Sequence, residues 1–269
     1  MSLADSQRSR RARLPTSVRG RAVLVAWAFI VPAFIFYATF VLVPIGLSIY
    51  YSLLRWDGIG KATFKGLSNY LVVLSESDFL QILGNAFQLV AYFTLIPVAI
   101  GLGVASAIRN HLGGRFGAAA RTVLFIPQVI PLVAAGIAWS WMLASNGVVN
   151  QALGLIGLGG IARGWLGDFD FALPAVGLIG AWVLLGLCTM LLVTGIARID
   201  PSLYEAAKID GASAWDEFRW ITLPGLRQEI GVCVTVTVIA ALASFDIVYI
   251  ATGGGPGIQT TVPGLEIYR

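Results

Sequence analysis

The residues whose types and spacing could do chemistry are concentrated in one segment, 198–227. It holds nine of the chain's charged residues, which number 18 basic and 14 acidic in all. Its carboxylates, among them Glu205 and Asp210, stand beside small residues such as Ala206, Ala207 and Gly211. No serine, histidine and aspartate arrangement and no paired carboxylates typical of catalysis accompany them. The chemistry this pattern supports is hydrogen bonding and helix capping at a docking surface.

The segment is predicted to form two short helices. Asp200 before Pro201, or Ser202 with an acid three residues on, is typical of a helix start. Gly211 predicts the stop, because a left-handed residue there meets no Cβ clash. Ser213, followed by acids in the first turn, predicts the second helix, which we expect Pro224 to end.

The second helix is expected to carry one apolar face, because Trp215, Phe218 and Ile221 recur every three residues. The small residues of the turn keep it slim enough for another protein to approach closely. We interpret the pair as a docking module for a partner's groove. The alternative from physics alone is an amphipathic helix pair that lies on lipid.

Other candidate sites point to structure rather than to chemistry. His111, the only histidine, has no cysteine or acidic cluster near it in sequence, and Cys188 and Cys233 lie inside apolar runs, where small buried thiols are common. The run 58–61 lacks the first glycine and the hydroxyl of a phosphate-binding loop. We therefore expect no catalytic, metal or cofactor-binding residue in this chain.

The elements that position these residues are membrane helices. The chain is 57% hydrophobic and 12% charged, with a mean hydropathy of +0.82, which excludes an ordinary soluble enzyme, a disordered chain and a disulfide scaffold. Charge-free runs are long enough to cross a bilayer. The sequence predicts an all-α polytopic bundle with five spans at 22–53, 84–108, 122–143, 173–197 and 230–252. The loop 144–172 is expected to hold a short amphipathic helix.

The basic residues predict the orientation. Six arginines lie in the tail 1–21, and with the N-terminus in the cytoplasm 13 of the 18 basic residues face that side. Arginines that directly precede a span are much more typical of a topogenic anchor than of a nucleic-acid-binding arm, so no nucleic-acid partner is expected.

Three residues are candidates for a translocation path. Pro127 and Pro131 predict a kink in the third span, which either lines a pathway or serves helix packing. Asp246 is the one acid near membrane depth; a cap on the glycine loop that follows it is favoured over contact with substrate.

The loop resembles that of a known family, the permease subunits of binding-protein-dependent ABC importers. Their signature is Glu-Ala-Ala, three residues, Gly, nine residues, and Ile-x-Leu-Pro, and this chain keeps every spacing from Glu205 to Pro224. The segments 64–70, 210–213 and 245–256 are similar to the sugar-type members. The resemblance covers the chain from about residue 22, so that a basic tail, 1–21, precedes a permease domain, 22–269.

The resemblance implies a function and partners. It implies that Glu205, Ala206, Ala207, Asp210, Gly211, Trp215 and Phe218 dock a cytoplasmic ATPase subunit, which binds ATP and Mg²⁺, at the 198–227 coupling loop. A second homologous permease and an external binding protein would complete the complex, in the cytoplasmic membrane of a bacterium or archaeon. The substrate would be a sugar, an oligosaccharide or glycerol phosphate.

One departure concerns the end of the chain. The family usually continues past its Gly-Gly-Gly-Pro loop into a sixth span, whereas this chain stops at 265–269. We expect either a shortened product or a fragment, in which one helix face is left uncovered.

Two rival functions remain at this point. An autonomous carrier or channel would need ionisable relay residues at the midplane, and the first four predicted spans contain no Asp, Glu, Lys or Arg. A receptor or scaffold would have no ATPase partner.

Overall fold

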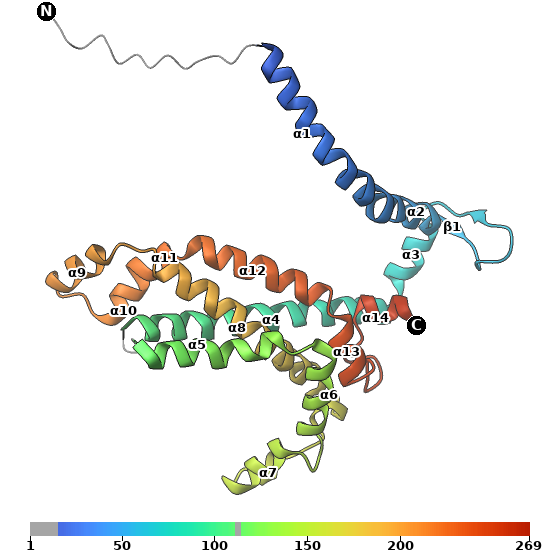
Figure 1. Cartoon of the computed structure of the whole chain (residues 1–269). Helices are drawn as coiled ribbons and strands as arrows, with labels where there is room; N and C mark the ends of the chain where they lie inside the picture. Colours follow the sequence, from blue (N-terminus) through green and yellow to red (C-terminus); the bar gives the residue numbers. More distant parts are fainter. Residues whose placement is uncertain (1–15, 111–113) are drawn as a thin grey trace, which may run out of the picture. The chain divides into compact units, whose positions relative to one another are not determined.

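The structure is a computed structural model that describes residues 16–110 and 114–269. The chain divides into two units, residues 1–75 and 76–269, and each is described by itself. Figure 1 shows the helices of both.

The first unit is dominated by one long apolar helix. It runs through α1 (Thr16–Tyr37), a π-helical stretch (Ala38–Leu42) and α2 (Val43–Ser52). This helix covers the expected span 22–53 and begins six residues earlier, inside the predicted tail. Pro44, the second residue of α2, lies just after the π-helical stretch and has no N–H to donate to the preceding turn.

The rest of the first unit adds one small hairpin to the helices that the sequence predicts. Two short strands, β1 (Leu54–Arg55) and β2 (Thr63–Phe64), pair antiparallel, and α3 (Ser68–Ser75) follows. Asn69 fastens this hairpin, since its Nδ2 donates to the carbonyls of Ser52 and Leu54, each at 2.9 Å. Glycines and a β-turn carboxylate (Asp57) between apolar residues favour such a hairpin over a helix.

The second unit is a bundle around α8 (Ala172–Ile196). Three helices pack on it: α4 (Ser77–Asn110), α5 (Gly114–Val129) and α12 (Arg227–Leu242). Glycines allow this close approach, as in other membrane helix pairs. A Cβ at Gly180 would overlap the ring of Phe93, and one at Gly186 would overlap the carbonyl of Leu124.

Three helices are long and apolar enough to cross a membrane within the described residues, at 25–52, 77–109 and 172–196. Two of these helices coincide with the expected spans 84–108 and 173–197, and the first of the two is longer than predicted. Up to five spans result if each of two bent helix pairs counts as one.

The third expected span, 122–143, is wrong as a single kinked helix. α5 ends at Val129, and α6 (Leu132–Met142) leaves at an angle of 99° to it. Pro131 supplies the reason, because its ring disfavours the helical conformation of the residue before it and because its own ψ is 136°. The sequence located the break, but not its size.

The fifth expected span, 230–252, is also wrong as one helix. α12 ends at Leu242, and a separate short helix, α13 (Phe245–Ala251), begins after Ser244, whose ψ of 59° is not helical. A glycine-rich loop then leads to α14 (Pro263–Tyr268).

The loop 144–172 contains the expected short helix, α7 (Val148–Leu155), and two 3₁₀ turns, Gly159–Ile161 and Trp165–Gly167. Asn150 holds the loop together. Its buried amide donates to the carbonyls of Ala144, Ser145 and Arg163 at 3.1, 3.1 and 2.7 Å, and its Oδ1 accepts from Trp165 Nε1 at 2.9 Å.

Candidate functional site: a capped helix pair clamped to the bundle

The 198–227 loop folds into short helices, as the sequence predicts. The first is α9 (Pro201–Ile209), with Pro201 at its first position and Asp200 as its N-cap. The Asp200 carboxylate accepts from the backbone N–H of Ser202 at 2.9 Å. This hydrogen bond, followed by one from the Ser202 side chain, holds the pKa of Asp200 below its usual value.

The turn between the helices depends on Gly211. Its φ of +78° lies in the left-handed region, as expected for a helix stop, and a Cβ there would meet nothing within 4 Å. α10 (Ala214–Glu217) then begins with a reciprocal capping box. The Ser213 N–H donates to Asp216 at 2.9 Å, and the Asp216 N–H donates back to Ser213 Oγ at 3.3 Å.

The second helix ends at Gly225, one residue after the predicted stop at Pro224. The chain continues from α10 through a π-helical stretch (Phe218–Thr222) into α11 (Leu223–Gly225). It bends by 68° only where α12 starts. Pro224 has no N–H to donate to the preceding helical turn, and the helix ends one residue later.

Four side chains, which we call the clamp, fasten this loop to the bundle. Arg109, at the end of α4, lies 3.4 Å from Glu217 of α10, whose side chain is only 7% exposed. The Arg109 guanidinium also lies over the ring of Tyr204 on α9, 3.1 Å from its centroid. Tyr204 shares a 3.0 Å hydroxyl–hydroxyl hydrogen bond with the buried Thr222. One arginine thus contacts both helices of the loop.

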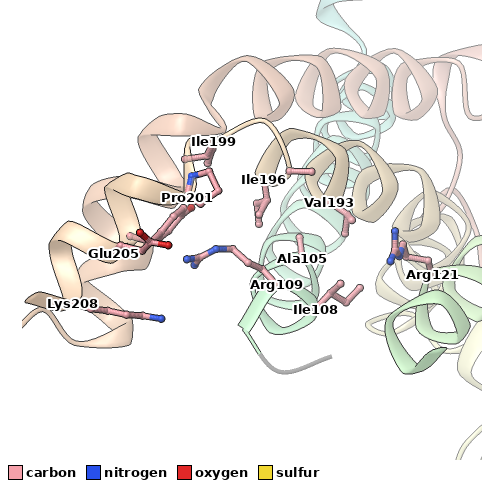
Figure 2. A pocket seen from close by; sticks show the side chains of 12 residues that line it. Ala105, Ile108, Arg109, Arg121, Val193, Ile196, Ile199, Pro201, Glu205 and Lys208 are labelled. Atoms are coloured by element: carbon pink, nitrogen blue, oxygen red, sulfur yellow. The ribbon is translucent and has the colours of Figure 1, made fainter. Parts of the chain in front are cut away.

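A cavity of about 440 Å³ opens beside the clamp, between α9 and the ends of α4, α5 and α8. Figure 2 shows the charged side chains at its wall, Arg109, Arg121, Glu205 and Lys208. Three of these four are cations, so the cavity is suited to an anion rather than to a metal ion.

The structure places the predicted docking residues on the exposed side of the loop. Glu205 and Ala206 are exposed on α9, Ala207 is half-buried, and Asp210 follows the helix end. Trp215 stacks on Phe218, with ring centroids 5.5 Å apart. Large apolar side chains remain uncovered around them: Ile209 is 86% exposed and Trp220 is 69% exposed.

The predicted path residues are only partly brought together. Asp246 lines a cavity of about 340 Å³ between α8 and the two helix breaks, together with Gln128 and Ser244. Neither Pro127, which is buried inside α5, nor Pro131 lines it. Asp246 makes no hydrogen bond to the glycine loop within the described residues, so the expected cap is not observed.

The glycine loop is held instead by threonines. The hydroxyls of Thr252 and Thr260 are 2.6 Å apart, and Thr261 Oγ1 donates to the Gly254 carbonyl at 3.1 Å. In the cavity, by contrast, the side-chain oxygens of Gln128 and Ser244 are buried and have no hydrogen-bond partner. An unpartnered buried oxygen beside a cavity is typical of a ligand-binding wall.

Sequence reasoning missed the clamp. It assigned Glu217 only to the helix dipole and counted Arg109 only among the basic residues of a loop. The pairing joins residues 108 positions apart, and no local spacing signals it. Sequence reasoning also missed the polar side chains of the cavity, because Gln128 and Ser244 lie in otherwise apolar runs.

The second unit is thus a bundle of membrane-type helices with an exposed, capped helix pair at one end. The family model for the binding-protein-dependent transport system inner membrane component matches residues 98–269. The chain belongs to this family. It is therefore the permease subunit of a binding-protein-dependent ABC transporter, and not the ATPase.

Named relatives extend over most of the chain. It is 33% identical over 248 residues to the probable ABC transporter permease protein YurN of Bacillus subtilis, covering 91% of this chain and 85% of that protein. It is 33% identical over 254 residues to the trehalose/maltose transport system permease protein MalF of Thermococcus litoralis, covering 92% and 83%.

The fold is that of a solved transporter. The structure of a bacterial alginate ABC transporter in complex with an alginate pentasaccharide-bound periplasmic protein matches with a TM-score of 0.73. The match covers 96% of this chain and 85% of that chain at 24% identity.

Proposed function

We propose that this permease imports a sugar or oligosaccharide, delivered by an external binding protein, and that a cytoplasmic ATPase drives it through the 198–227 loop. The observation that carries the proposal is the clamp, because it joins an exposed docking loop to a spanning helix. A second permease subunit would complete the pathway, and the N-terminus would lie in the cytoplasm, as the arginines of the tail favour.

The docking surface has the chemistry of a protein contact. The uncovered Trp215, Trp220 and Ile209 supply apolar area, and Glu205 and Asp210 supply acceptors at its edge. The small Ala206 allows a partner backbone to approach α9 closely. A lipid-facing helix pair would instead expose few carboxylates between its apolar residues.

The clamp supplies the mechanical link. Movement of the loop by a closing ATPase would act on Glu217 and Tyr204, and Arg109 would carry it to α4 because it contacts both side chains. α4 packs on α8 and α12, two helices of the cavity wall. The loop and the cavity can therefore change together, which alternating access requires.

The cavity at the helix breaks is our candidate for the substrate path. Broken helices are tolerated at membrane depth where they line a polar cavity. The unpartnered oxygens of Gln128 and Ser244 and the carboxylate of Asp246 would accept hydrogen bonds from sugar hydroxyls. In this proposal Pro127 and Pro131 shape the break and do not touch the substrate.

The turn offers the sharpest test. Gly211→Val places a β-branched residue at φ +78°, which costs about 1–2 kcal/mol in backbone strain and nothing in contacts. We expect loss of uptake in cells and loss of ATPase co-purification, with normal membrane insertion. Gly211→Asn is the matched control, since asparagine tolerates this conformation, and it should transport.

Two results would overturn the proposal. If Gly211→Val transports as well as the wild type, the loop is not the coupling element. If the purified chain transports sugar in vesicles without ATP or a second subunit, it is an autonomous carrier.

A further inference from the structure

Two cavities of the second unit share a single residue, Arg121 of α5. One is the cavity beside the clamp, which it lines with Arg109 and Lys208. The other is a groove of about 310 Å³ along the outer side of α5, lined by Arg121, Thr122, Phe125, Ile126, Val129 and Met190. A basic compartment thus adjoins an apolar one.

Apart from Arg121 at one end, the groove is apolar. Arg121, Phe125 and Val129 follow one another at four-residue spacing and so lie on one face of α5. Thr122 contributes its methyl group, because its hydroxyl donates to the Ala118 carbonyl of its own helix at 3.1 Å. Ile126 is 53% and Val129 70% exposed, so no described element covers this face.

The charge of the basic compartment suits a monoanion. Arg109 is paired with Glu217, and Glu205 contributes one carboxylate to the wall, which leaves Arg121 and Lys208 with an excess of one positive charge. The Arg121 side chain is oriented by its own backbone, because Nε donates to the Gly117 carbonyl at 3.0 Å. Its two terminal nitrogens are not used by that bond, and arginine and lysine are the usual phosphate-binding side chains.

We propose that these two cavities bind one anionic phospholipid. Its phosphate lies in the basic cavity, which Lys208 and Arg121 line from opposite ends (Figure 2), and an acyl chain lies in the groove on Phe125, Ile126 and Val129. A basic pocket between membrane helices next to apolar surface is a recognised form of lipid headgroup site. A free phosphate would use the first compartment only and would leave the groove unexplained.

The site has a consequence for the 198–227 loop. Lys208 belongs to α9, whereas Arg121 belongs to α5, so a bound headgroup would join the loop to the bundle next to the clamp. The anionic lipid content of the membrane would then influence how firmly the loop is held. This inference concerns the chain alone and does not depend on the proposed substrate.

The test is lipid binding to the full chain. The detergent-purified protein is titrated with phosphatidylglycerol, and bound lipid is counted by native mass spectrometry. Removing one cation near a membrane phosphate costs about fivefold in affinity, so Arg121→Gln and Lys208→Gln should each lose about that factor and the double variant roughly 25-fold. Arg227→Gln is the matched control, because it removes the same charge outside both cavities, and it should bind as the wild type does.

A second set of measurements distinguishes binding of the whole lipid from binding of its phosphate alone. Ile126→Ser should weaken phosphatidylglycerol binding, and inorganic phosphate should not displace the lipid. Phosphatidylcholine should bind the wild type no better than the double variant. All variants should keep the wild-type thermal unfolding temperature, since the changed side chains are exposed or lie at the surface.

Three outcomes would overturn the proposal. Equal binding of phosphatidylglycerol by the wild type and the double variant would exclude the headgroup compartment. Full displacement by inorganic phosphate, with no effect of Ile126→Ser, would show an ion site without a lipid. Burial of the α5 face by a co-purifying second polypeptide that blocks the lipid would assign the groove to a protein partner.

Discussion

Removal of the Arg109 side chain should destabilise the second unit far more than removal of a comparable surface arginine. Arg109→Ala leaves Glu217 as a carboxylate whose side chain is 7% exposed, without its cation, and it also removes the stacking on Tyr204. The loss of one partner from a fully buried pair costs about 3–5 kcal/mol, whereas exposed pairs contribute about 0–1 kcal/mol. Because Arg109 itself is 22% exposed, we expect about 2–3 kcal/mol.

The chain contains a matched control. Arg198 and Glu229 form a second arginine–glutamate pair, 3.5 Å apart, but the Arg198 side chain is 74% exposed. Arg198→Ala should therefore cost no more than about 1 kcal/mol. Two pairs with nearly the same distance and different burial thus separate the contribution of burial from that of Coulomb attraction.

The assay uses the protein's own buried thiols. Cys188 and Cys233 are free and fully buried, so a thiol-reactive fluorophore reports unfolding in detergent at a fixed heating rate. At about 2–4 °C per kcal/mol, Arg109→Ala should lower the unfolding temperature by about 4–12 °C and Arg198→Ala by no more than about 4 °C.

A double-mutant cycle decides whether the clamp is the cause. Arg109→Ala and Glu217→Ala are measured singly and together, and direct contact predicts that the double variant loses less than the sum. A coupling energy below about 0.5 kcal/mol would refute the argument, because the two side chains would then stabilise the fold independently. Equal shifts for Arg109→Ala and Arg198→Ala would refute the role given to burial.

Three further outcomes are expected. Gly186→Ala should destabilise the bundle by about 1–3 kcal/mol in the thiol assay, because the new Cβ meets a backbone carbonyl that cannot rotate away. Gly84→Ala is the control: its Cβ would face open space, so the change should be neutral or slightly stabilising. Asn150→Asp should make the loop 144–172 susceptible to protease, because a carboxylate would face the three carbonyls to which the amide donates. Asn146→Asp, at an exposed position, should leave the loop resistant. Because the pKa of Asp200 is lowered in the folded protein, its helix cap is fully present above the ordinary pKa of 3.8 and is lost as the pH falls through the lower folded pKa. Pepsin cleavage near α9 should therefore increase only at such acid pH. Asp200→Asn should abolish this pH dependence.

Each of these outcomes can fail in a defined way. A stable Gly186→Ala variant would mean that α5 and α8 separate without cost. Equal protease resistance of the Asn150→Asp and Asn146→Asp variants would mean that the Asn150 amide does not hold its loop. Acid-induced cleavage that persists in Asp200→Asn would assign the pH dependence to another group.

The membrane class, the long apolar helices and the capped helix pair of the 198–227 loop could be predicted from the sequence because each depends on local information. A charge-free apolar run such as 173–197 is long enough to cross the bilayer as a helix, and this depends on its own composition only. The helix stop at Gly211 and the start at Ser213 depend on the backbone and side chains of neighbouring residues only. These features therefore agree with the structure to within a few residues.

The size of the helix breaks and the composition of the site depended on the tertiary structure. Pro131 marks a break, but packing of α6 against α13 decides that it becomes a 99° turn and not a kink. Arg109 and Glu217 meet because α4 and α10 end at the same place in the bundle. Asp246 and Gln128 line the same cavity because the two helix breaks border it. The sequence determined which segments enter the membrane and where the loop is capped, since hydropathy and capping act over a few residues. Only the fold decided which charges become buried partners, because that depends on contacts between segments far apart in the chain.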